Sequence, residues 1–135
     1  MAPSDLVFRT LTNTDRGFYT LMGPLFGSRA VHKSLGGPAF DDDGKTWIVA
    51  VDGHRRAAGF VGVTRTGAVE SLYTAPGNND LRAELVAAAV TAAGDRPLHA
   101  TVTHSRAAAY RAAGFETVSE TTNFTKLTRH PQESS

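Results

Sequence analysis

The stretch Leu72-Tyr73-Thr74-Ala75-Pro76-Gly77-Asn78-Asn79-Asp80-Leu81 joins the end of a strand, a turn and the start of a helix. Leucine, tyrosine and threonine suit a strand, whereas proline, glycine and paired asparagines mark a turn. Behind the turn, apolar residues recur every three or four positions, as on one face of a helix. They are Leu81, Leu85, Ala88, Ala89 and Ala92, and Gly94 follows as a stop. The stretch therefore leads from a strand into the main helix of the chain.

Three strands in succession precede and include this point. Trp47 to Val51 is an apolar run that suits a buried strand, and Asp52-Gly53 is the strongest short hairpin signal in the sequence. The partner strand is Ala58 to Val63, and Ala68 to Thr74 follows after another short connection. We therefore expect an antiparallel meander of three strands.

One strand and two short helices come before the meander. Leu6 to Thr12 alternates as a strand does, with at least one buried face. Thr14 or Asp15 is a good N-cap for a helix whose apolar stripe runs from Phe18 to Phe26. A second helix is predicted over Ser28 to Leu35.

The C-terminal part predicts a strand, a helix and a last strand. Leu98 to Thr103 is the first strand, Ser105 caps a helix that runs through Ala113, and Gly114-Phe115 ends that helix. Thr121 to Thr128 is predicted as the last strand. The order β-α-α-β-β-β-α-β-α-β indicates the α/β class with a mixed sheet, in which the strand after the main helix can run parallel to the strand before it.

Length and composition favour one globular domain over residues 1–129, followed by a polar tail over residues 130–135. The 135 residues include 14 basic and 13 acidic side chains, so nucleic-acid binding is neither required nor excluded. The absence of cysteine rules out disulfides, zinc thiolate sites and thiol nucleophiles. The five histidines show no pair at metal-ligand spacing, and no signal peptide or membrane span is evident, so we expect a cytoplasmic protein without a metal.

Two segments, Leu72 to Pro76 and Ala107 to Phe115, together with the order of elements, resemble the GNAT superfamily of N-acetyltransferases. In that family a strand of the first kind runs into a pyrophosphate-binding turn, and a later helix carries a tyrosine four residues before a Gly-Phe pair. The resemblance covers nearly the whole chain. It implies a GNAT-like mixed β-sheet and an acyltransferase that moves an acyl group, with acetyl-CoA as the expected donor, to an amine by direct attack.

The resemblance implies that Tyr110 is the catalytic acid, protonating the departing thiolate of coenzyme A. A phenol has a pKa comparable to that of a thiol, which suits this transfer. Glu70 lies where some members of the family keep a glutamate base, two residues before Leu72 and so on the same face of a regular strand. Two interpretations of Glu70 stay open: a general base for the amine, or an exposed edge glutamate paired with an arginine.

For the co-substrate, the resemblance implies that free backbone groups of Leu72, Tyr73 and Thr74 bond the pantetheine arm. The family's next turn reads R/Q-x-x-G-x-G/A, and its glycines are absent here. The residues expected to hold the pyrophosphate are Asn78, Asn79, Asp80, Leu81 and Arg82. Backbone N–H groups at a helix start bind anions without glycine, Asp80 is expected to cap the helix, and Arg82 is expected to contact a phosphate.

The acceptor is not specified by the sequence. Arg29 and Lys33 lie in the helix pair that lines the acceptor side in this family, so they are candidates for binding an acidic or phosphorylated acceptor; a solvated helix face is the alternative. His104 is a candidate proton shuttle or a surface residue. Two other functions remain open, a nucleobase-modifying enzyme of the same fold that does not use standard acetyl-CoA and a catalytically degenerate interaction module, and a homodimer through the last strand suits either.

Overall fold

The computed structural model describes residues 6–35, 44–78 and 80–130. The elements in chain order are β1 (Val7–Leu11), α1 (Phe18–Phe26), α2 (Arg29–Leu35), β2 (Thr46–Val51), β3 (Ala57–Val63), β4 (Val69–Thr74), α3 (Leu81–Ala93), β5 (Leu98–Thr103), α4 (His104–Ala112), β6 (Glu116–Glu120) and β7 (Phe124–Arg129). The predicted order and the α/β class are confirmed, with one strand added at the C-terminus.

The C-terminal prediction is incomplete in one respect: the predicted last strand over Thr121 to Thr128 is present as β7, which begins at Phe124, and an unpredicted strand, β6, forms a hairpin with it. β6 pairs with β7, and the N–H of Thr121 donates to the carbonyl of Phe124 at 2.8 Å across the turn. All five residues of β6 are exposed. A strand without a buried face leaves no alternation of apolar residues, so the sequence carries no signal for it.

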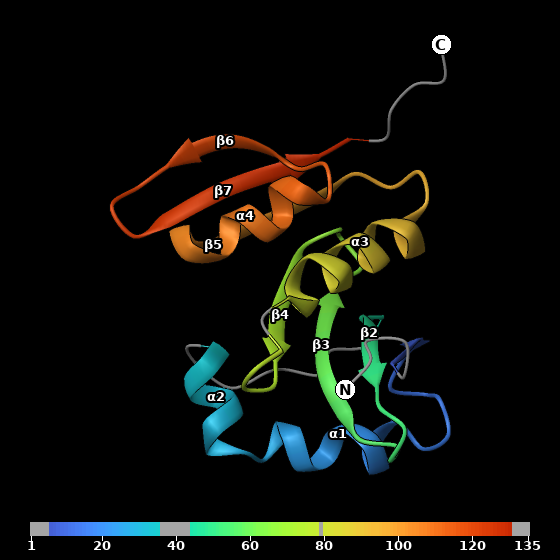
Figure 1. Cartoon of the computed structure of the whole chain (residues 1–135). Coiled ribbons are helices and arrows are strands. Elements are labelled where there is room, and N and C mark those ends of the chain that lie inside the picture. Colours follow the sequence, from blue (N-terminus) through green and yellow to red (C-terminus); the bar gives the residue numbers. More distant parts are fainter. Residues whose placement is uncertain (1–5, 36–43, 79, 131–135) are drawn as a thin grey trace.

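Two antiparallel sheets make up the fold, one in the order β1-β2-β3-β4 and the other in the order β5-β7-β6. Between them there is one parallel bridge, which pairs Ala68 with His99, and the N–H of His99 donates to the carbonyl of Gly67 at 3.0 Å. The predicted parallel pairing of the strands around α3 is therefore limited to one end of β4. Figure 1 shows the second sheet beyond the end of the first, with α4 packed against it.

Helices cover both faces of the first sheet, because β2 and its neighbours are apolar on both sides. Ile48 and Ala50 join the cluster that packs under α3 and α4, whereas Trp47 and Val49 join the cluster under α1 and α2. Trp47 is fully buried, as predicted for a core residue. Burial of such apolar side chains is the main stabilising contribution in a domain of this size.

Two predicted helix starts are corrected by the backbone. α1 begins at Phe18 behind Gly17, whose φ is 83°, while the Asp15 carboxylate accepts a hydrogen bond from the N–H of Thr12 at 2.7 Å in the preceding turn. An aspartate that closes its own turn is not available as a cap three residues later. At α4 the N-cap is Thr103, two residues before the predicted Ser105.

Three expectations concern residues or states beyond the described structure. The predicted tail residues 131–135 and the predicted cofactor residue Asn79 lie outside the described residues. A homodimer through the last strand stays a prediction. Among the described helices, none has the length and apolar character needed to cross a membrane.

Candidate active site

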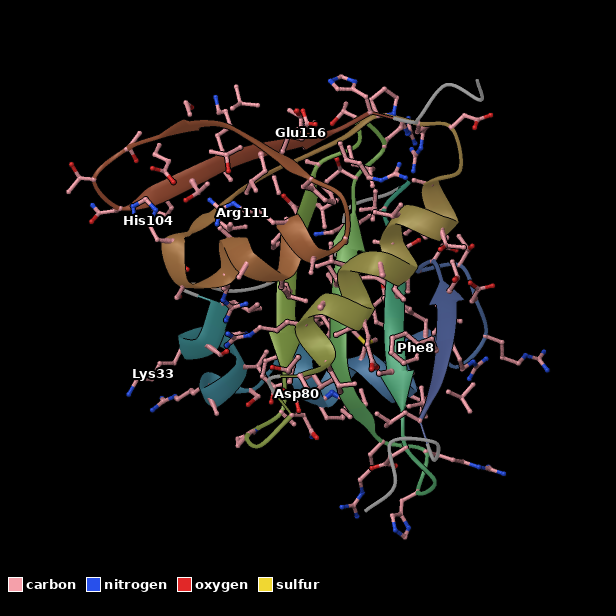
Figure 2. The ribbon with its side chains drawn as sticks, turned by 45° about the horizontal axis from the view of Figure 1, so that its top comes forward. Phe8, Lys33, Asp80, His104, Arg111 and Glu116 are labelled. Carbon is pink, nitrogen blue, oxygen red and sulfur yellow. The ribbon has the colours of Figure 1, made fainter. Side chains whose placement is uncertain are left out.

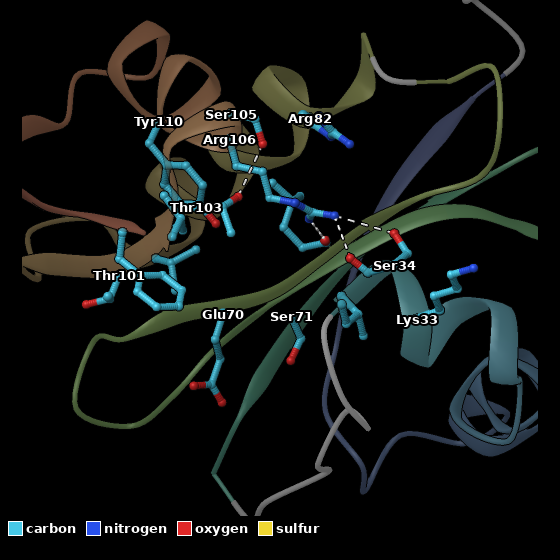
Figure 3. A pocket seen from close by; sticks show the side chains of 15 residues that line it. Lys33, Ser34, Glu70, Ser71, Arg82, Thr101, Thr103, Ser105, Arg106 and Tyr110 are labelled. Atoms are coloured by element: carbon cyan, nitrogen blue, oxygen red, sulfur yellow. Dashed lines mark hydrogen bonds between the residues drawn. The ribbon is translucent and has the colours of Figure 1, made fainter. Parts of the chain in front are cut away.

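A cavity of about 490 Å³ lies between β4 and β5, where the two strands part beyond their single bridge. α2, β4, the start of α3, β5, α4 and the start of β7 all contribute to its lining. The lining side chains are those of Lys33, Ser34, Leu35, Val69, Glu70, Ser71, Leu72, Arg82, Thr101, Val102, Thr103, Ser105, Arg106, Tyr110 and Phe124, shown in Figure 3.

Five of the predicted site residues therefore meet in one place, although they come from four elements. They are Lys33, Glu70, Leu72, Arg82 and Tyr110. The other described candidates do not line the cavity, and they are Arg29, Tyr73, Thr74, Asn78, Asp80 and Leu81. Arg29 is exposed on α2, and Tyr73 and Thr74 are buried.

A β-bulge in β4 sets the direction of its side chains. The register of β3 with β4 shifts between Phe60 and Gly62, where two residues of β4, Ser71 and Leu72, stand opposite one of β3. Ser71 has a φ of 59°, in the left-handed region. An extra residue reverses the alternation of faces, so the expectation that Glu70 and Leu72 share a face is wrong.

Tyr110 is held on α4 with its ring at the edge of the core. Its residue is 1% exposed, and its ring meets that of Phe115 edge-on, with 5.4 Å between ring centroids. Burial raises the pKa of Tyr110 to about 12, and the charge of Arg106 opposes part of that rise. A phenol is protonated at neutral pH with or without this rise, so Tyr110 has the form that a general acid needs, and the rise makes it a weaker acid than a free phenol.

Glu70 is bonded to a lysine rather than to the predicted arginine. Lys45 Nζ lies 2.8 Å from Glu70 Oε1, and the same ammonium lies 4.4 Å from the centroid of the Trp47 ring. Lys45 is buried ahead of β2, where a sequence pattern gives no sign of an ion pair with a residue 25 positions away. Glu70 is thus fixed at one oxygen while its side chain remains partly exposed at the cavity.

Arg106 is a cavity residue that the sequence did not single out. Its guanidinium donates to the carbonyl oxygen of Leu72 and, from Nη2, to the carbonyl oxygen of Ser34 at 2.9 Å. It thereby ties α4 to β4 and α2 across the opening (Figure 3). The Leu72 carbonyl, one of the backbone groups predicted to bond pantetheine, already accepts a hydrogen bond from the protein.

The start of α3 has the turn that the sequence predicts, without the predicted side-chain cap. Gly77 has a φ of 86°, and the N–H of Leu81 donates to the carbonyl of Asn78 at 2.9 Å. Asp80 occupies the N-cap position, but its side chain makes no capping hydrogen bond. Arg82 turns toward the cavity, and its buried Nε has no hydrogen-bond partner among the described residues.

His104 is not among the residues that line the cavity. Its Nδ1 lies 2.7 Å from Thr125 Oγ1, and its Nε2 lies 3.0 Å and 3.1 Å from the carbonyl oxygens of Thr121 and Thr122. Two carbonyl neighbours require that Nε2 carry the proton and donate it. Both ring nitrogens are therefore engaged in holding the β6–β7 turn, which argues against the predicted proton shuttle. Among the described residues, no three His, Asp or Glu side chains gather as a metal site would require.

Solved structures of three bacterial acyltransferases share this fold. The spermidine N-acetyltransferase of Vibrio cholerae, in complex with CoA and spermine, is 14% identical with a TM-score of 0.68, covering 95% of this chain and 96% of its own. An acyl-CoA N-acyltransferase from Pseudomonas aeruginosa is 15% identical with a TM-score of 0.69, covering 91% of this chain and 99% of its own. The Campylobacter jejuni N-acetyltransferase PseH, in complex with acetyl coenzyme A, is 14% identical with a TM-score of 0.59, covering 94% of this chain and 99% of its own.

These likenesses define the class of fold, which is the GNAT fold of N-acetyltransferases, over nearly the whole chain. The likeness is one of structure, because no protein-family model and no curated protein matches the sequence of the chain.

Proposed function

We propose that the protein is an N-acyltransferase that uses an acyl-CoA, with acetyl-CoA as the donor, and an amine as the acceptor. The observation that carries this proposal is the position of Tyr110 in the cavity between β4 and β5, beside the bulged segment of β4. The GNAT-fold structures that contain CoA or acetyl coenzyme A support the choice of donor.

In the proposed reaction, the amine nitrogen attacks the thioester carbonyl, a C–N bond forms and the C–S bond breaks. Tyr110, which like any phenol is protonated at neutral pH, supplies a proton to the departing sulfur. Glu70, through a water molecule, takes a proton from the amine. A backbone N–H of β4 is the proposed donor to the carbonyl oxygen as negative charge develops on it.

The residues around the cavity fit a CoA ester in part. Arg82 lines the cavity at the start of α3, so its guanidinium suits a phosphate oxygen, and the backbone N–H groups of the helix start add to it. The Leu72 carbonyl suits a pantetheine amide only after Arg106 moves from it. We therefore assign the pyrophosphate to Arg82 and to the backbone N–H groups in the first turn of α3, where the Asp80 side chain makes no capping hydrogen bond.

The test is titration calorimetry with acetyl-CoA and with CoA, followed by measurement of thiol release with a panel of amines. Tyr110→Phe is expected to retain binding and to lower kcat by about 10²- to 10⁴-fold, the usual contribution of a general acid. Tyr19→Phe is the matched control, because Tyr19 is exposed on α1 and does not line the cavity. If neither acetyl-CoA nor CoA binds at about 1 mM, a weak affinity for any cofactor, the proposal fails.

One observation favours a second function, a ligand-binding module without acyl transfer. Arg106 already donates a hydrogen bond to the carbonyl oxygen of Leu72, which a bound pantetheine would need as the acceptor for its own amide N–H. In such a module, small molecules bind the cavity while acetyl-CoA does not compete with them. Competition calorimetry, with acetyl-CoA added before the small molecule, separates the two functions.

A further inference from the structure

The guanidinium of Arg106 is bonded to neutral groups alone among the described residues. Its partners are the carbonyl oxygens of Leu72 and Ser34, with the Ser34 hydroxyl oxygen at 3.4 Å. Burial lowers the pKa of Arg106, and the nearby charge of Arg82 lowers it further. A partly buried cation is stabilised most by an anion, and carbonyl oxygens replace that anion only in part.

The rest of the cavity adds positive charge rather than compensating it. Arg82 has a buried Nε without a partner, and Lys33 lies at the rim on α2. Glu70 is the one carboxylate among the described lining residues, and Lys45 already binds it at 2.8 Å. Figure 3 shows the side chains of Arg82 and Arg106 on the same side of the cavity, with Arg106 extending toward Ser34. The cavity therefore favours a ligand with negative charge.

We propose that the amine acceptor carries a carboxylate or a phosphate group, and that Arg106 binds this group. The proposal rests on the proposed acyltransferase function. An anion approaching between Leu72 and Ser34 meets two N–H donors of one planar guanidinium, the arrangement that suits a carboxylate or phosphate. The anion takes over these donors from the two neutral carbonyl groups.

The position of Arg106 assigns the anion to the acceptor rather than to the donor. Arg82 and the start of α3 are assigned to the phosphates of the donor. Arg106 instead donates to the carbonyl oxygen of Ser34, near the end of α2. An acceptor held there by its anionic group lies in the same cavity as Glu70 and Tyr110. With Arg82 assigned to the donor, Lys33 and Arg106 still give the described lining an excess of positive charge, and a polyamine such as the spermine bound in the Vibrio cholerae structure would add to it.

The first test compares matched pairs of amines with the unaltered protein and acetyl-CoA. O-phosphoethanolamine is paired with ethanolamine, and β-alanine with propylamine, so each pair differs by one anionic group. We expect kcat/KM to be at least about 10-fold higher for the anionic member of one pair, the gain of a charge-assisted hydrogen bond. Preference for phosphate over carboxylate, or the reverse, identifies the anion. Higher kcat/KM for spermidine or for the neutral amines overturns the proposal.

The second test uses Arg106→Gln, which removes the charge and keeps an N–H donor. We expect kcat/KM to fall about 10- to 100-fold with the anionic amine and by less than about 3-fold with its neutral partner. Arg111→Gln is the control, since Arg111 also lies on α4 (Figure 2) but bonds Thr117 and Glu120 of β6 and does not line the cavity. Equal losses on both members of a pair indicate a structural role for Arg106 and contradict the proposal. Should Arg106→Gln fail to fold, Arg106→Lys retains the charge and is expected to retain part of the preference.

Failure of the acyltransferase function is distinguished by calorimetry without the donor. If acetyl-CoA does not bind, O-phosphoethanolamine and ethanolamine are titrated into the unaltered protein and into Arg106→Gln. Binding of the phosphate compound alone, lost in Arg106→Gln, supports the anion site even though the proposed function has failed. Equal binding of the two compounds, or no binding at about 10 mM, overturns the anion site as well.

Discussion

Lys45 Nζ lies 2.8 Å from Glu70 Oε1, and the two side chains are buried very unequally, at 1% and 45% exposure. The buried partner lies over the Trp47 ring, and the exposed partner lines the cavity. The ion pair therefore connects the core under α1 and α2 to the candidate active site.

The unequal burial predicts unequal costs when either partner is replaced. Glu70→Gln leaves a buried ammonium beside a neutral amide, and we expect the free energy of unfolding to fall by about 1–2 kcal/mol, less than for a fully buried pair because Glu70 is half exposed. Lys45→Met is expected to cost less than about 1 kcal/mol, because Met fills the site over Trp47 and Glu70 returns to water. Urea unfolding measures both.

The control for this comparison is Glu120→Gln, which removes the exposed pair with Arg111 at 3.5 Å and should change stability by less than about 0.5 kcal/mol. A larger cost for Lys45→Met than for Glu70→Gln would contradict the assignment of Lys45 as the buried partner.

Gly62 provides the space that the Lys45 side chain occupies. A Cβ at Gly62 would overlap Lys45 Cε and lie 3.3 Å from the Trp47 ring. Gly62→Ala is expected to lower the free energy of unfolding by about 1–3 kcal/mol, as overpacking in a core does. Gly53→Ala serves as the control, since nothing lies within 4 Å of the added Cβ. Combining Gly62→Ala with Lys45→Ala should cost less than the sum of the single changes; strict additivity would show that the two residues do not compete for space.

The buried phenol of Tyr110 makes the free energy of unfolding fall as the pH becomes alkaline. Burial raises its pKa to about 12 from the ordinary value of 10.0, so the contribution is complete below about pH 10 and is lost as pH rises toward about 12. Between about pH 10 and pH 12 the free energy of unfolding of the unaltered protein should fall by about 2–3 kcal/mol more than that of Tyr110→Phe. Urea unfolding of both proteins over this range measures the difference, and parallel curves would rule out the buried phenol as its source.

Ser71 holds the β4 bulge in a conformation that glycine adopts at less cost. Its φ of 59° is left-handed, so Ser71→Gly is expected to raise stability by up to about 1 kcal/mol, and Ser71→Val to lower it by about 1–2 kcal/mol. Thermal unfolding is the measurement. Ser119→Val, the same change at an exposed position of β6 that has no left-handed φ, should stay within about 0.5 kcal/mol. Similar effects at both serines would mean that the bulge carries no strain.

The strands and helices whose apolar residues repeat at regular spacing were predicted from the sequence, and the reason is physical. The meander and α3 bury one or both faces, and burial imposes the apolar pattern that the sequence displays. Tyr110 was singled out by the resemblance of Ala107 to Phe115 to the GNAT pattern, and it does line the cavity. β6 buries none of its residues, so its sequence has no apolar alternation from which a strand could be predicted.

The bulge and Arg106 depend on distant partners and could not be predicted. Val69 to Thr74 has the composition of a regular strand, and the extra residue is apparent only in its pairing with β3. Arg106 stands among alanines on a short helix, a pattern typical of a solvated face. Its direction is set by Leu72 and Ser34, 34 and 72 positions away in the chain.

Among the described residues, one parallel bridge, between Ala68 and His99, joins the ends of β4 and β5. Farther along β4 the link to the C-terminal part is a side chain, because Arg106 donates to the carbonyl oxygens of Leu72 and Ser34. We therefore expect the width of the cavity to depend on how this one side chain is placed, and to change more readily than the spacing of two strands joined by a full ladder of backbone hydrogen bonds.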